Sequence, residues 1–465
     1  FQLKQSSHCL DLCIYRDYRN NHQVFFKREN EMNLIIKKTL LLKGQLTPPG
    51  SKSQSIRALI LGAVGHGKTV LENLSYSDDT QDAINICRYL GSEISESGTT
   101  VTIKSNGLPL KITSNEIYSG SSGITTCFVM PILGLRENAD QPIVLNCSDQ
   151  MRSRPIKPLV DALTHLGLNI SYLKNPNALP IRVSGSLIGA KTYIDGITSQ
   201  YLSALLLALP CAPKNSEIKV KNLQERSYVE MTLQCLKEHD IQFSHKVTEG
   251  YDQYHIVGRQ HYKNSNKIIS CDFSSASYLI AAGVLIPGEI ILQGLDMADP
   301  QGDKQLMSIL QIMGADIVIE PQHLRIRGGK KLSGIKIDAQ DIPDLLPTLA
   351  VLGTYASGKT EIYNVGHARI KETDRNYSMA DGLRRLNAKI DEHADGLTIY
   401  QSVLQGNHVK GYGDHRTVMA LSVAGMIANG TTLIEDSEAI NKTFPSFISS
   451  MRLLGANMEV ENANA

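Results

Sequence analysis

A dense cluster of small polar and cationic residues stands at the start of an apolar segment. It reads Pro49-Gly50-Ser51-Lys52-Ser53-Gln54-Ser55-Ile56-Arg57. The first turn of an α-helix leaves backbone N–H groups unpaired and carries about half a positive charge, and glycine and serine let an anion approach closely. Lys52 and Arg57 add two cations to this helix end. A capped surface helix would explain the serines but not the density of Gly, Ser and Lys, so we interpret the segment as an anion-binding site.

Segments of this kind recur six times along the chain. Each starts with small polar residues, continues through a run rich in Ala, Leu and Ile, and usually ends near Gly. The six segments are Gly50–Gly65, Gly120–Gly134, Gly196–Pro210, Asp272–Gly283, Pro343–Gly353 and Gly413–Gly425, which start about 70 to 76 residues apart. Helices that are apolar over most of their surface belong in the interior, so several units must pack around shared helices with sheets outside. If the helices share a polarity, their starts converge on one cleft suited to multiply anionic or phosphorylated substrates.

A second series in phase with the first marks the ends of other helices. Short motifs similar to Leu-Gly-x-x-Ile recur along the chain, and the second residue of each motif is Gly91, Gly167, Asp240, Gly314, Asn387 or Gly455. Gly or Asn just after a helix is the expected left-handed cap, and a strand then begins. The chain is therefore six copies of a unit with two helices and several strands. Its length favours two domains.

Composition narrows the function classes. The chain has 465 residues, 42% of them hydrophobic, and a net charge of +1, which excludes a disordered or fibrous protein and argues against a nucleic-acid scaffold or polybasic membrane binder. The eight cysteines form no CxxC pair or zinc-type cluster, which suggests free thiols in a reducing compartment. The longest apolar stretches, Tyr201–Leu209 and Tyr278–Ile286, are too short to span a bilayer. We expect no nucleic-acid or membrane partner.

Residues 62–69 match the nucleotide-binding P-loop pattern GxxxxGK[ST]. A P-loop must follow a strand and open a helix. Here the order is reversed, because Ser55–Gly62 reads as a helix and Thr69–Leu74 as a strand. We interpret the match as a turn, and ATP hydrolysis that depends on Lys68 would be the sign of the rival P-loop enzyme.

The chain resembles a known family, the 5-enolpyruvylshikimate-3-phosphate synthases among the enolpyruvyl transferases. The resemblance rests on residues 49–57 and on later segments in the same order, from about Leu40 to about Leu454. These segments are Arg154-Pro155, Thr198-Ser199-Gln200, Asp272-Phe273-Ser274-Ser275-Ala276-Ser277, Ile342-Pro343-Asp344, Lys371-Glu372-Thr373-Asp374-Arg375, Gly413-Asp414-His415-Arg416 and Lys442-Thr443-Phe444-Pro445. Any one segment alone would be weak evidence, but Pro49–Ser53, Lys371–Arg375 and Asp414–Arg416 together are specific.

The resemblance implies an α/β (α+β) fold, a two-domain inside-out α/β barrel built from six βαβαββ repeats, three per domain, with the active site in the interdomain cleft. One domain would comprise residues 50–270, and the other residues 32–49 plus 271–465. We expect residues 1–31 to be a disordered N-terminal extension, either dispensable or derived from upstream sequence; a family-specific N-terminal strand is the alternative. Because the chain begins with Phe, its natural start is an open question.

The implied activity is that of a 3-phosphoshikimate 1-carboxyvinyltransferase. It transfers the enolpyruvyl group of phosphoenolpyruvate to the 5-hydroxyl of shikimate 3-phosphate and releases phosphate through a tetrahedral intermediate. The reaction belongs to the shikimate pathway, which supplies chorismate for aromatic amino-acid biosynthesis. It needs a base, an acid and cations that hold two phosphates and a carboxylate, but no metal or redox cofactor. We expect a cytoplasmic monomer whose partners are the two small-molecule substrates.

The resemblance also assigns site residues. Asp344 resembles the base that faces the 5-hydroxyl, with a helix-capping Asp as the alternative, and Glu372 resembles the second acid or base, with a solvated charged face as the alternative. Lys52 is the other candidate proton donor to the enol methylene. Residues expected at shikimate 3-phosphate are Lys52, Ser53, Arg57, Thr198, Ser199, Gln200, Asp344, His367 and Lys371. Residues expected at phosphoenolpyruvate are Lys52, Gly123, Arg154, Gln200, Arg375, Arg416 and Lys442. Asp414 and His415 would orient Arg416 and the cleft wall, and Tyr228 packs either on the shikimate ring or in the core or rim.

The match departs from the family at three positions. Ile124 and Cys127 stand where the family usually has Thr and Arg, and Arg136 is too far along a helix to replace that Arg. Glu225 stands where a phosphate-contacting Ser is common, and an acid near a phosphate should weaken binding. We expect an active enzyme with weaker phosphoenolpyruvate affinity. The alternatives are a diverged, low-activity or inactive anion-binding relative, and enolpyruvyl transfer to UDP-N-acetylglucosamine.

Overall fold

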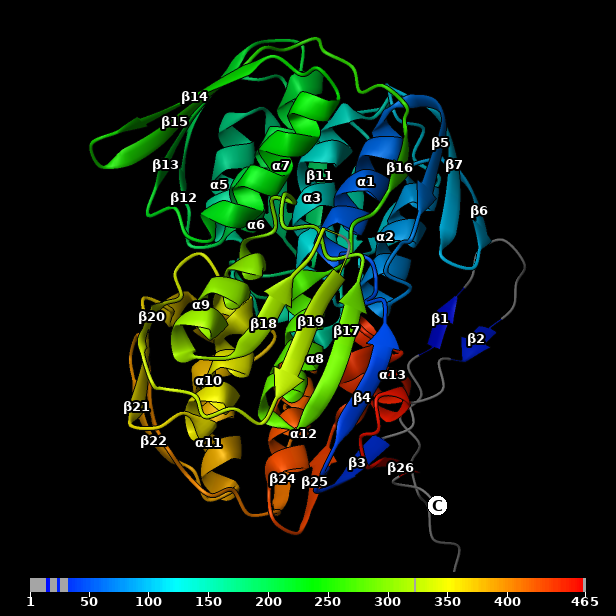
Figure 1. Cartoon of the computed structure of the whole chain (residues 1–465). Coiled ribbons are helices and arrows are strands. Elements are labelled where there is room, and N and C mark those ends of the chain that lie inside the picture. The colour runs from blue at the N-terminus through cyan, green and yellow to red at the C-terminus, as the bar shows by residue number, and fades with distance from the viewer. Residues whose placement is uncertain (1–13, 17–22, 26–31, 322, 463–465) are drawn as a thin grey trace, which may run out of the picture.

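The computed structural model describes residues 14–16, 23–25, 32–321 and 323–462. Within these residues the chain forms six four-stranded sheets and one separate two-stranded sheet (Figure 1). Each four-stranded sheet has one parallel pair of neighbouring strands and two antiparallel pairs. This shared pairing pattern confirms the prediction of six repeats. The described sheets do not join into one continuous hydrogen-bonded barrel.

Three of the sheets belong to the upper half of Figure 1. In spatial order they are β16 (Asn266–Ile268), β5 (His66–Glu72), β7 (Thr100–Asn106), β6 (Glu93–Ser97); β10 (Leu168–Tyr172), β11 (Ile181–Gly185), β9 (Ile143–Asn146), β8 (Glu116–Tyr118); and β12 (Lys191–Asp195), β13 (Ser216–Lys221), β15 (Tyr251–Ile256), β14 (Phe243–Thr248).

The other three sheets belong to the lower half. They are β18 (Asp316–Ile319), β19 (His323–Gly328), β17 (Gly288–Gln293), β4 (Leu42–Leu46); β20 (Lys336–Asp338), β21 (Lys359–Tyr363), β23 (Gly396–Tyr400), β22 (Lys389–His393); and β24 (His408–Lys410), β25 (Thr431–Glu435), β3 (Met32–Lys37), β26 (Met458–Asn462). The two-stranded sheet pairs β1 (Ile14–Arg16) with β2 (Gln23–Phe25) inside the expected N-terminal extension. The rest of that extension lies outside the described residues.

Six helices are buried along nearly their whole length. They are α1 (Lys52–Val64), α3 (Gly123–Ile132), α6 (Ser199–Ala208), α8 (Phe273–Leu285), α10 (Leu346–Tyr355) and α12 (His415–Ile427). Each coincides with one of the six apolar segments, although α8, α10 and α12 run two residues past the predicted ends. Every residue of α8 is buried. In one half α3 contacts α1 and α6, and in the other α8, α10 and α12 contact one another. The prediction that these helices are interior is confirmed.

The remaining α-helices lie between strands of the same sheet and include the second helix of each repeat. The other α-helices are α2 (Asp78–Tyr89), α4 (Asp149–Arg152), α5 (Lys157–His165), α7 (Arg226–Glu238), α9 (Leu306–Met313), α11 (Arg375–Arg385) and α13 (Phe447–Leu453). The 3-10 helices are η1 (Leu133–Leu135), η2 (Leu209–Cys211), η3 (Gly302–Gln305), η4 (Pro343–Leu345), η5 (Gly366–Ile370) and η6 (Ser437–Lys442). Among the described residues, none of the helices is both long and apolar enough to cross a membrane.

The left-handed caps predicted after six helices are present. Gly91, Gly167, Asp240, Gly314, Asn387 and Gly455 all have positive φ, between 57° and 106°. Because an L side chain is disfavoured in this region, four of the six positions are glycine, and Asn and Asp are the side chains that tolerate it best. The repeat recognised in the sequence therefore reflects a backbone requirement.

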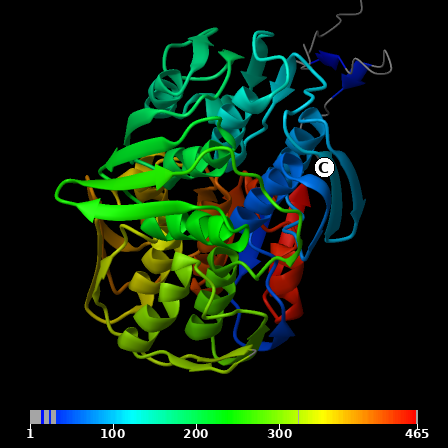
Figure 2. The same cartoon turned by 90° about the horizontal axis from the view of Figure 1, so that it is seen from above.

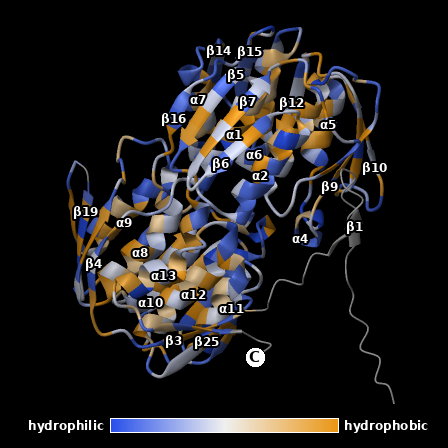
Figure 3. Cartoon of the chain, turned by 90° about the vertical axis from the view of Figure 1, so that its right-hand side faces the viewer, coloured by the Kyte–Doolittle hydropathy of each residue, from blue (hydrophilic) through white to orange (hydrophobic). Residues whose placement is uncertain are grey.

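Hydrophobic side chains gather in two core clusters. One spans residues 56–269, and the other combines residues 34–42 with residues 271–458. Figure 3 shows the two lobes side on, with apolar residues on the buried helices. The two chain crossings between the lobes lie side by side, since the N–H of Ser51 donates to the carbonyl of Ser270 and the N–H of Asp272 donates to that of Pro49. Figure 2 shows the whole molecule from above.

The P-loop match is confirmed as a turn between a helix and a strand. It runs from the end of α1 into β5, and Lys68 lies on that strand with an exposed side chain. The order of elements is the reverse of a nucleotide-binding loop.

Candidate active site

A polar cleft lies where the starts of inner helices from both lobes meet. It encloses about 550 Å³ of space open to solvent. Its lining includes Lys52, Ser53, Arg57, Asp79, Gly123, Ile124, Phe128, Arg154, Ser199, Gln200, Glu225, Tyr228, Asp344, Lys371, Glu372, Arg375 and Arg416. Lys52, Gly123, Ser199 and Arg375 are the first residues of α1, α3, α6 and α11, so electropositive helix starts point at one space.

Arg375 joins three carboxylates in this cleft. Its side chain is almost fully buried, and it donates to Asp414 (2.8 Å), Asp344 (2.6 Å) and Glu372 (2.5 Å). The planar guanidinium has donors on three sides, which is why one arginine can hold three acids. Asp414 also caps α12 by accepting from the N–H of Arg416 at 2.8 Å. Its side chain therefore orients the guanidinium of Arg375, whereas the sequence led us to expect Arg416.

Asp344 lies between two arginines and a tyrosine. Besides Arg375, it accepts from Arg416 at 2.6 Å and from the hydroxyl of Tyr228 at 2.7 Å. Burial alone would raise the pKa of Asp344, but Arg416 and Arg375 lower it well below its usual value. The carboxylate is therefore ionised at neutral pH. The sequence left open whether Tyr228 packs on the shikimate ring or in the core or rim. In the structure its hydroxyl donates a hydrogen bond directly to Asp344.

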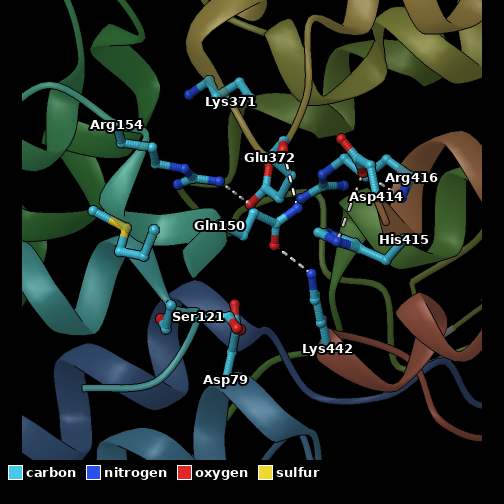
Figure 4. A network of polar contacts seen from close by, with 12 residues as sticks. Asp79, Ser121, Gln150, Arg154, Lys371, Glu372, Asp414, His415, Arg416 and Lys442 are labelled. Atoms are coloured by element: carbon cyan, nitrogen blue, oxygen red, sulfur yellow. Dashed lines mark hydrogen bonds and ion pairs between the residues drawn. The ribbon is translucent and has the colours of Figure 1, made fainter. Parts of the chain in front are cut away.

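Glu372 is held between the two lobes. It pairs with Arg154 at 2.9 Å and with Arg375, and Figure 4 shows it at the centre of the polar network. Burial would raise the pKa of Glu372, but Arg154 and Arg375 bring it well below the usual value. A solvated charged face, the alternative for this residue, is thereby excluded, because the side chain is only 13% exposed and pairs with two arginines.

Lys52 points into the cleft from the start of α1. Its ammonium group lies 2.9 Å from Asp79 at the start of α2, and both side chains are buried. Asp79 and neighbouring Asp82 lie near a third helix start, since Asp82 accepts from the N–H of Ser121 at 3.1 Å. Burial and the charge of Asp79 raise the pKa of Asp82 to about 7.

The start of α6 already has a carboxylate bound to it. Glu225 accepts from the N–H and the hydroxyl of Ser199, at 2.9 and 2.6 Å, and from the hydroxyl of Thr198 at 3.2 Å. It also forms an ion pair with Lys371. These donors are residues that the sequence assigns to shikimate 3-phosphate.

Three assigned residues lie beside the cleft and not on its lining. Thr198 lines a smaller adjoining cavity, together with Cys127 and Arg154. His367 lies near Glu225 and Lys371, and burial lowers its pKa although Glu225 opposes this. Lys442 donates to Gln150 at 2.5 Å and to the carbonyl of Gly413 at 2.9 Å, as Figure 4 shows in part. Arg57 is on the lining, but its donors are engaged by Thr232, Ser53 and Tyr228.

The missing arginine at position 127 is not replaced by Arg136. That side chain donates to the carbonyls of Leu133, Asn138, Ala139 and Gln141, away from the cleft. The thiol of Cys127 is buried and lies 3.6 Å from the side-chain oxygen of Gln200. At the start of the same helix, a Cβ on Gly123 would collide with the guanidinium of Arg154. The helix therefore approaches Arg154 closely but adds no cation.

Sequence reasoning missed Asp79, Phe128 and Gln150. Asp79 belongs to an acidic first turn, Asp78-Asp79, which is a common helix-capping pattern and gave no reason to expect an ion pair with Lys52. Gln150 bridges the lobes by donating to the carbonyls of Glu372 and Gly413. The phenyl ring of Phe128 lies under the guanidinium of Arg57 at 5.2 Å. A single Phe or Gln outside any motif does not indicate, in a sequence, that the residue belongs to a functional site.

Two solved structures share the fold of this chain. The EPSP synthase of Acinetobacter baumannii has a TM-score of 0.78 and 23% sequence identity, in a match covering 93% of this chain and 100% of that one. The enolpyruvyl transferase NikO of Streptomyces tendae has a TM-score of 0.75 and 16% identity, covering 94% and 100%. The α/β fold is thus that of the enolpyruvyl transferases, as the sequence led us to expect.

Sequence comparisons define the family within that class. Residues 36–451 match the family model for EPSP synthase (3-phosphoshikimate 1-carboxyvinyltransferase). A 3-phosphoshikimate 1-carboxyvinyltransferase of Acetivibrio thermocellus is 39% identical over 415 residues, 89% of this chain and 96% of that protein. One of Methanocaldococcus jannaschii is 38% identical over 432 residues, 92% and 99% of the two chains. The chain therefore belongs to the EPSP synthase family of transferases, and UDP-N-acetylglucosamine is not favoured as its acceptor.

Proposed function

We propose that this chain transfers the enolpyruvyl group of phosphoenolpyruvate to the 5-hydroxyl of shikimate 3-phosphate in the cleft described above. One observation carries the proposal: Lys52, Asp344, Glu372 and Arg416 line a single cleft although they are distant in sequence. Family membership supports the same reaction. The transfer breaks the C–O bond between the enolpyruvyl carbon and the phosphate, and forms a new bond from that carbon to the acceptor oxygen.

Cations in the cleft would hold the negative groups of both substrates. Arg154, Arg375 and Arg416 are buried, and planar guanidinium groups pair with carboxylates and phosphates in two places. In the structure these arginines pair with Glu372, Asp344 and Asp414. The anions of phosphoenolpyruvate therefore compete with protein carboxylates for the same cations.

This competition would tune the two acids for proton transfer. A carboxylate with a strongly lowered pKa is a poor base, and Asp344 and Glu372 both have one while the arginines bind them. When substrate anions take a share of the arginines, the pKa values of both acids rise. Asp344 would then accept the proton of the 5-hydroxyl, and Glu372 or Lys52 would give a proton to the enol methylene.

The two core clusters suggest the domain organisation. We assign residues 50–270 to one domain and residues 32–49 plus 271–465 to the other, joined by the paired crossings near Ser51 and Asp272. We further propose that the protein acts as a monomer, since every group in the proposed chemistry comes from one chain. We also propose a cytoplasmic location, since the scattered cysteines suggest a reducing compartment. No metal or redox cofactor enters the reaction as proposed.

Phosphate release from phosphoenolpyruvate with each of two acceptors tests the proposal. We expect release with shikimate 3-phosphate and none with UDP-N-acetylglucosamine. Release only with the sugar nucleotide would reassign the acceptor. Calorimetric binding of shikimate 3-phosphate without turnover would instead identify an inactive anion-binding relative.

A further inference from the structure

The carboxylate of Glu225 is bound as an anionic ligand would be bound. One of its oxygens accepts from the N–H and hydroxyl of Ser199 and the hydroxyl of Thr198, and the other pairs with the ammonium group of Lys371. Backbone N–H, two hydroxyls and an ammonium group are the donors that proteins use to bind phosphate oxygens. The start of α6 therefore binds an anion that belongs to the chain itself, the carboxylate of Glu225.

This carboxylate is charged and enclosed. The residue is 1% exposed, yet it lines the active-site cleft. Burial would raise the pKa of Glu225, but Lys371, His367 and the hydrogen bonds from Lys371 and Ser199 lower it below its usual value. A fixed negative charge therefore occupies this corner of the cleft at neutral pH.

The backbone on either side of Glu225 is firmly held. Glu225 has a left-handed φ of 57° at the start of α7, and its N–H donates to the carbonyl of Gln340 in the other lobe. The next residue, Arg226, donates its N–H to Asp341 at 2.8 Å and its guanidinium to Asp252. The carboxylate can therefore leave the start of α6 by side-chain rotation and not by movement of the chain.

We propose that Glu225 is an internal competitor for the phosphate group of the acceptor substrate. This inference rests on the proposed function and on the family resemblance, which assigns Ser199 and Lys371 to shikimate 3-phosphate. With no acceptor bound, the carboxylate balances the charge of Lys371 and keeps the donors of α6 oriented. The acceptor phosphate takes over these donors and displaces the carboxylate, because two anions in one buried subsite repel each other strongly.

Glu225 thus sets the affinity of the cleft for the acceptor. Its removal relieves the competition for Lys371 and Ser199. We therefore expect tighter binding of the acceptor when the carboxylate is absent.

The test compares E225S and E225Q with the wild type in the full chain. E225S removes the carboxylate, E225Q keeps its shape without its charge, and E230Q removes an exposed acid on the same helix as the matched control. Calorimetry without phosphoenolpyruvate should give a dissociation constant for shikimate 3-phosphate about tenfold lower in E225S and E225Q, equivalent to about 1.4 kcal/mol. E230Q should match the wild type. An unchanged or weaker affinity in both Glu225 variants would overturn the proposal.

A second measurement separates this inference from the function itself. Removing one partner of a buried ion pair destabilises a protein, so E225S should melt below the wild type when no anion is present. Inorganic phosphate should raise the melting temperature of E225S by a few degrees more than that of the wild type, because it fills the vacated subsite. This result requires no turnover and would hold even if the acceptor were misassigned.

Two outcomes of these measurements would overturn the inference. One is an equal effect of phosphate on the melting of the wild type and E225S. The other is a wild type that binds unphosphorylated shikimate more tightly than shikimate 3-phosphate, because Glu225 would then be a permanent replacement for the phosphate and not its competitor.

Discussion

Arg375 Nη1 lies 2.6 Å from Asp344 Oδ1, and the two residues are 31 positions apart in the chain. The same guanidinium also holds Glu372 and Asp414, so both acids proposed to act in proton transfer share one cation. This arrangement makes the protonation of each acid depend on what else binds Arg375. Any anionic substrate that pairs with Arg375 changes the basicity of Asp344 and Glu372 together.

Replacing Asp344 by Asn should abolish most of the turnover. The amide keeps the size of the side chain but cannot accept the proton of the acceptor hydroxyl, so kcat should fall by at least about 100-fold. Calorimetry should still detect binding of shikimate 3-phosphate. Asp391→Asn, an exposed acid on β22, is the control and should leave kcat unchanged. Retention of more than a tenth of the wild-type kcat by D344N would contradict the assigned role.

The buried network around Arg375 should contribute strongly to stability. Arg375→Lys keeps the charge but cannot reach three carboxylates with the same geometry, and breaking a buried ion pair costs about 3–5 kcal/mol. Urea unfolding should show a loss of this order. Arg327→Lys, whose exposed side chain pairs with Glu289 at 2.8 Å, should change stability by less than about 1 kcal/mol. Equal effects of the two substitutions would disprove the special role of the network.

Cys127→Arg should lower the Michaelis constant for phosphoenolpyruvate. The thiol faces the cavity that Arg154, Gln200 and Lys371 also line, so a guanidinium from position 127 would add a cation beside the cleft. Steady-state phosphate release at fixed shikimate 3-phosphate gives the constant. Cys127→Met, which adds length without charge, is the control. An unchanged or higher Michaelis constant in C127R would count against this explanation of the missing arginine.

Asp82 should make stability fall as pH rises through the range from about 4 to about 7. Its pKa is raised to about 7 in the folded protein, so the folded state binds more protons than the unfolded state in this range. Protonated Asp82 makes its full contribution to folding stability below the pKa of the unfolded state, and this contribution is lost as the pH approaches 7. Asp82→Asn cannot ionise, so the variant should gain stability relative to the wild type as pH rises. Urea unfolding from pH 4 to 8 checks this, and parallel pH curves would refute it.

Lys68→Ala should leave every activity unchanged within about twofold. Lys68 is exposed on β5 and does not line the cleft. ATP hydrolysis by the wild type that disappears in K68A would restore the nucleotide-binding alternative. Phosphate release from ATP and from phosphoenolpyruvate, measured on the same preparations, decides between the two.

The repeat architecture could be predicted because it is local. Apolar periodicity, small residues at helix starts and left-handed caps act within a few residues, and each repeats at a nearly constant spacing. The P-loop match at residues 62–69 could be rejected for the same reason. The helix there precedes the strand, and the two elements can be told apart because they have different periods of apolar residues. The site residues near Lys52 and Arg375 came instead from the resemblance to a family. The residues that line the cleft without a family motif, such as Asp79 and Phe128, gave no signal.

By itself the sequence determined six buried helices, their polar starts and the supply of cations beside them. Only the tertiary structure decided which charges pair. Arg375 takes acids from three separate segments, and Glu225 reaches Lys371 from 146 residues away. Helix starts and caps follow from backbone geometry that each residue carries locally. The pairing of buried charges depends on how the two lobes pack, because desolvated charges are stable only where the fold brings a partner to them.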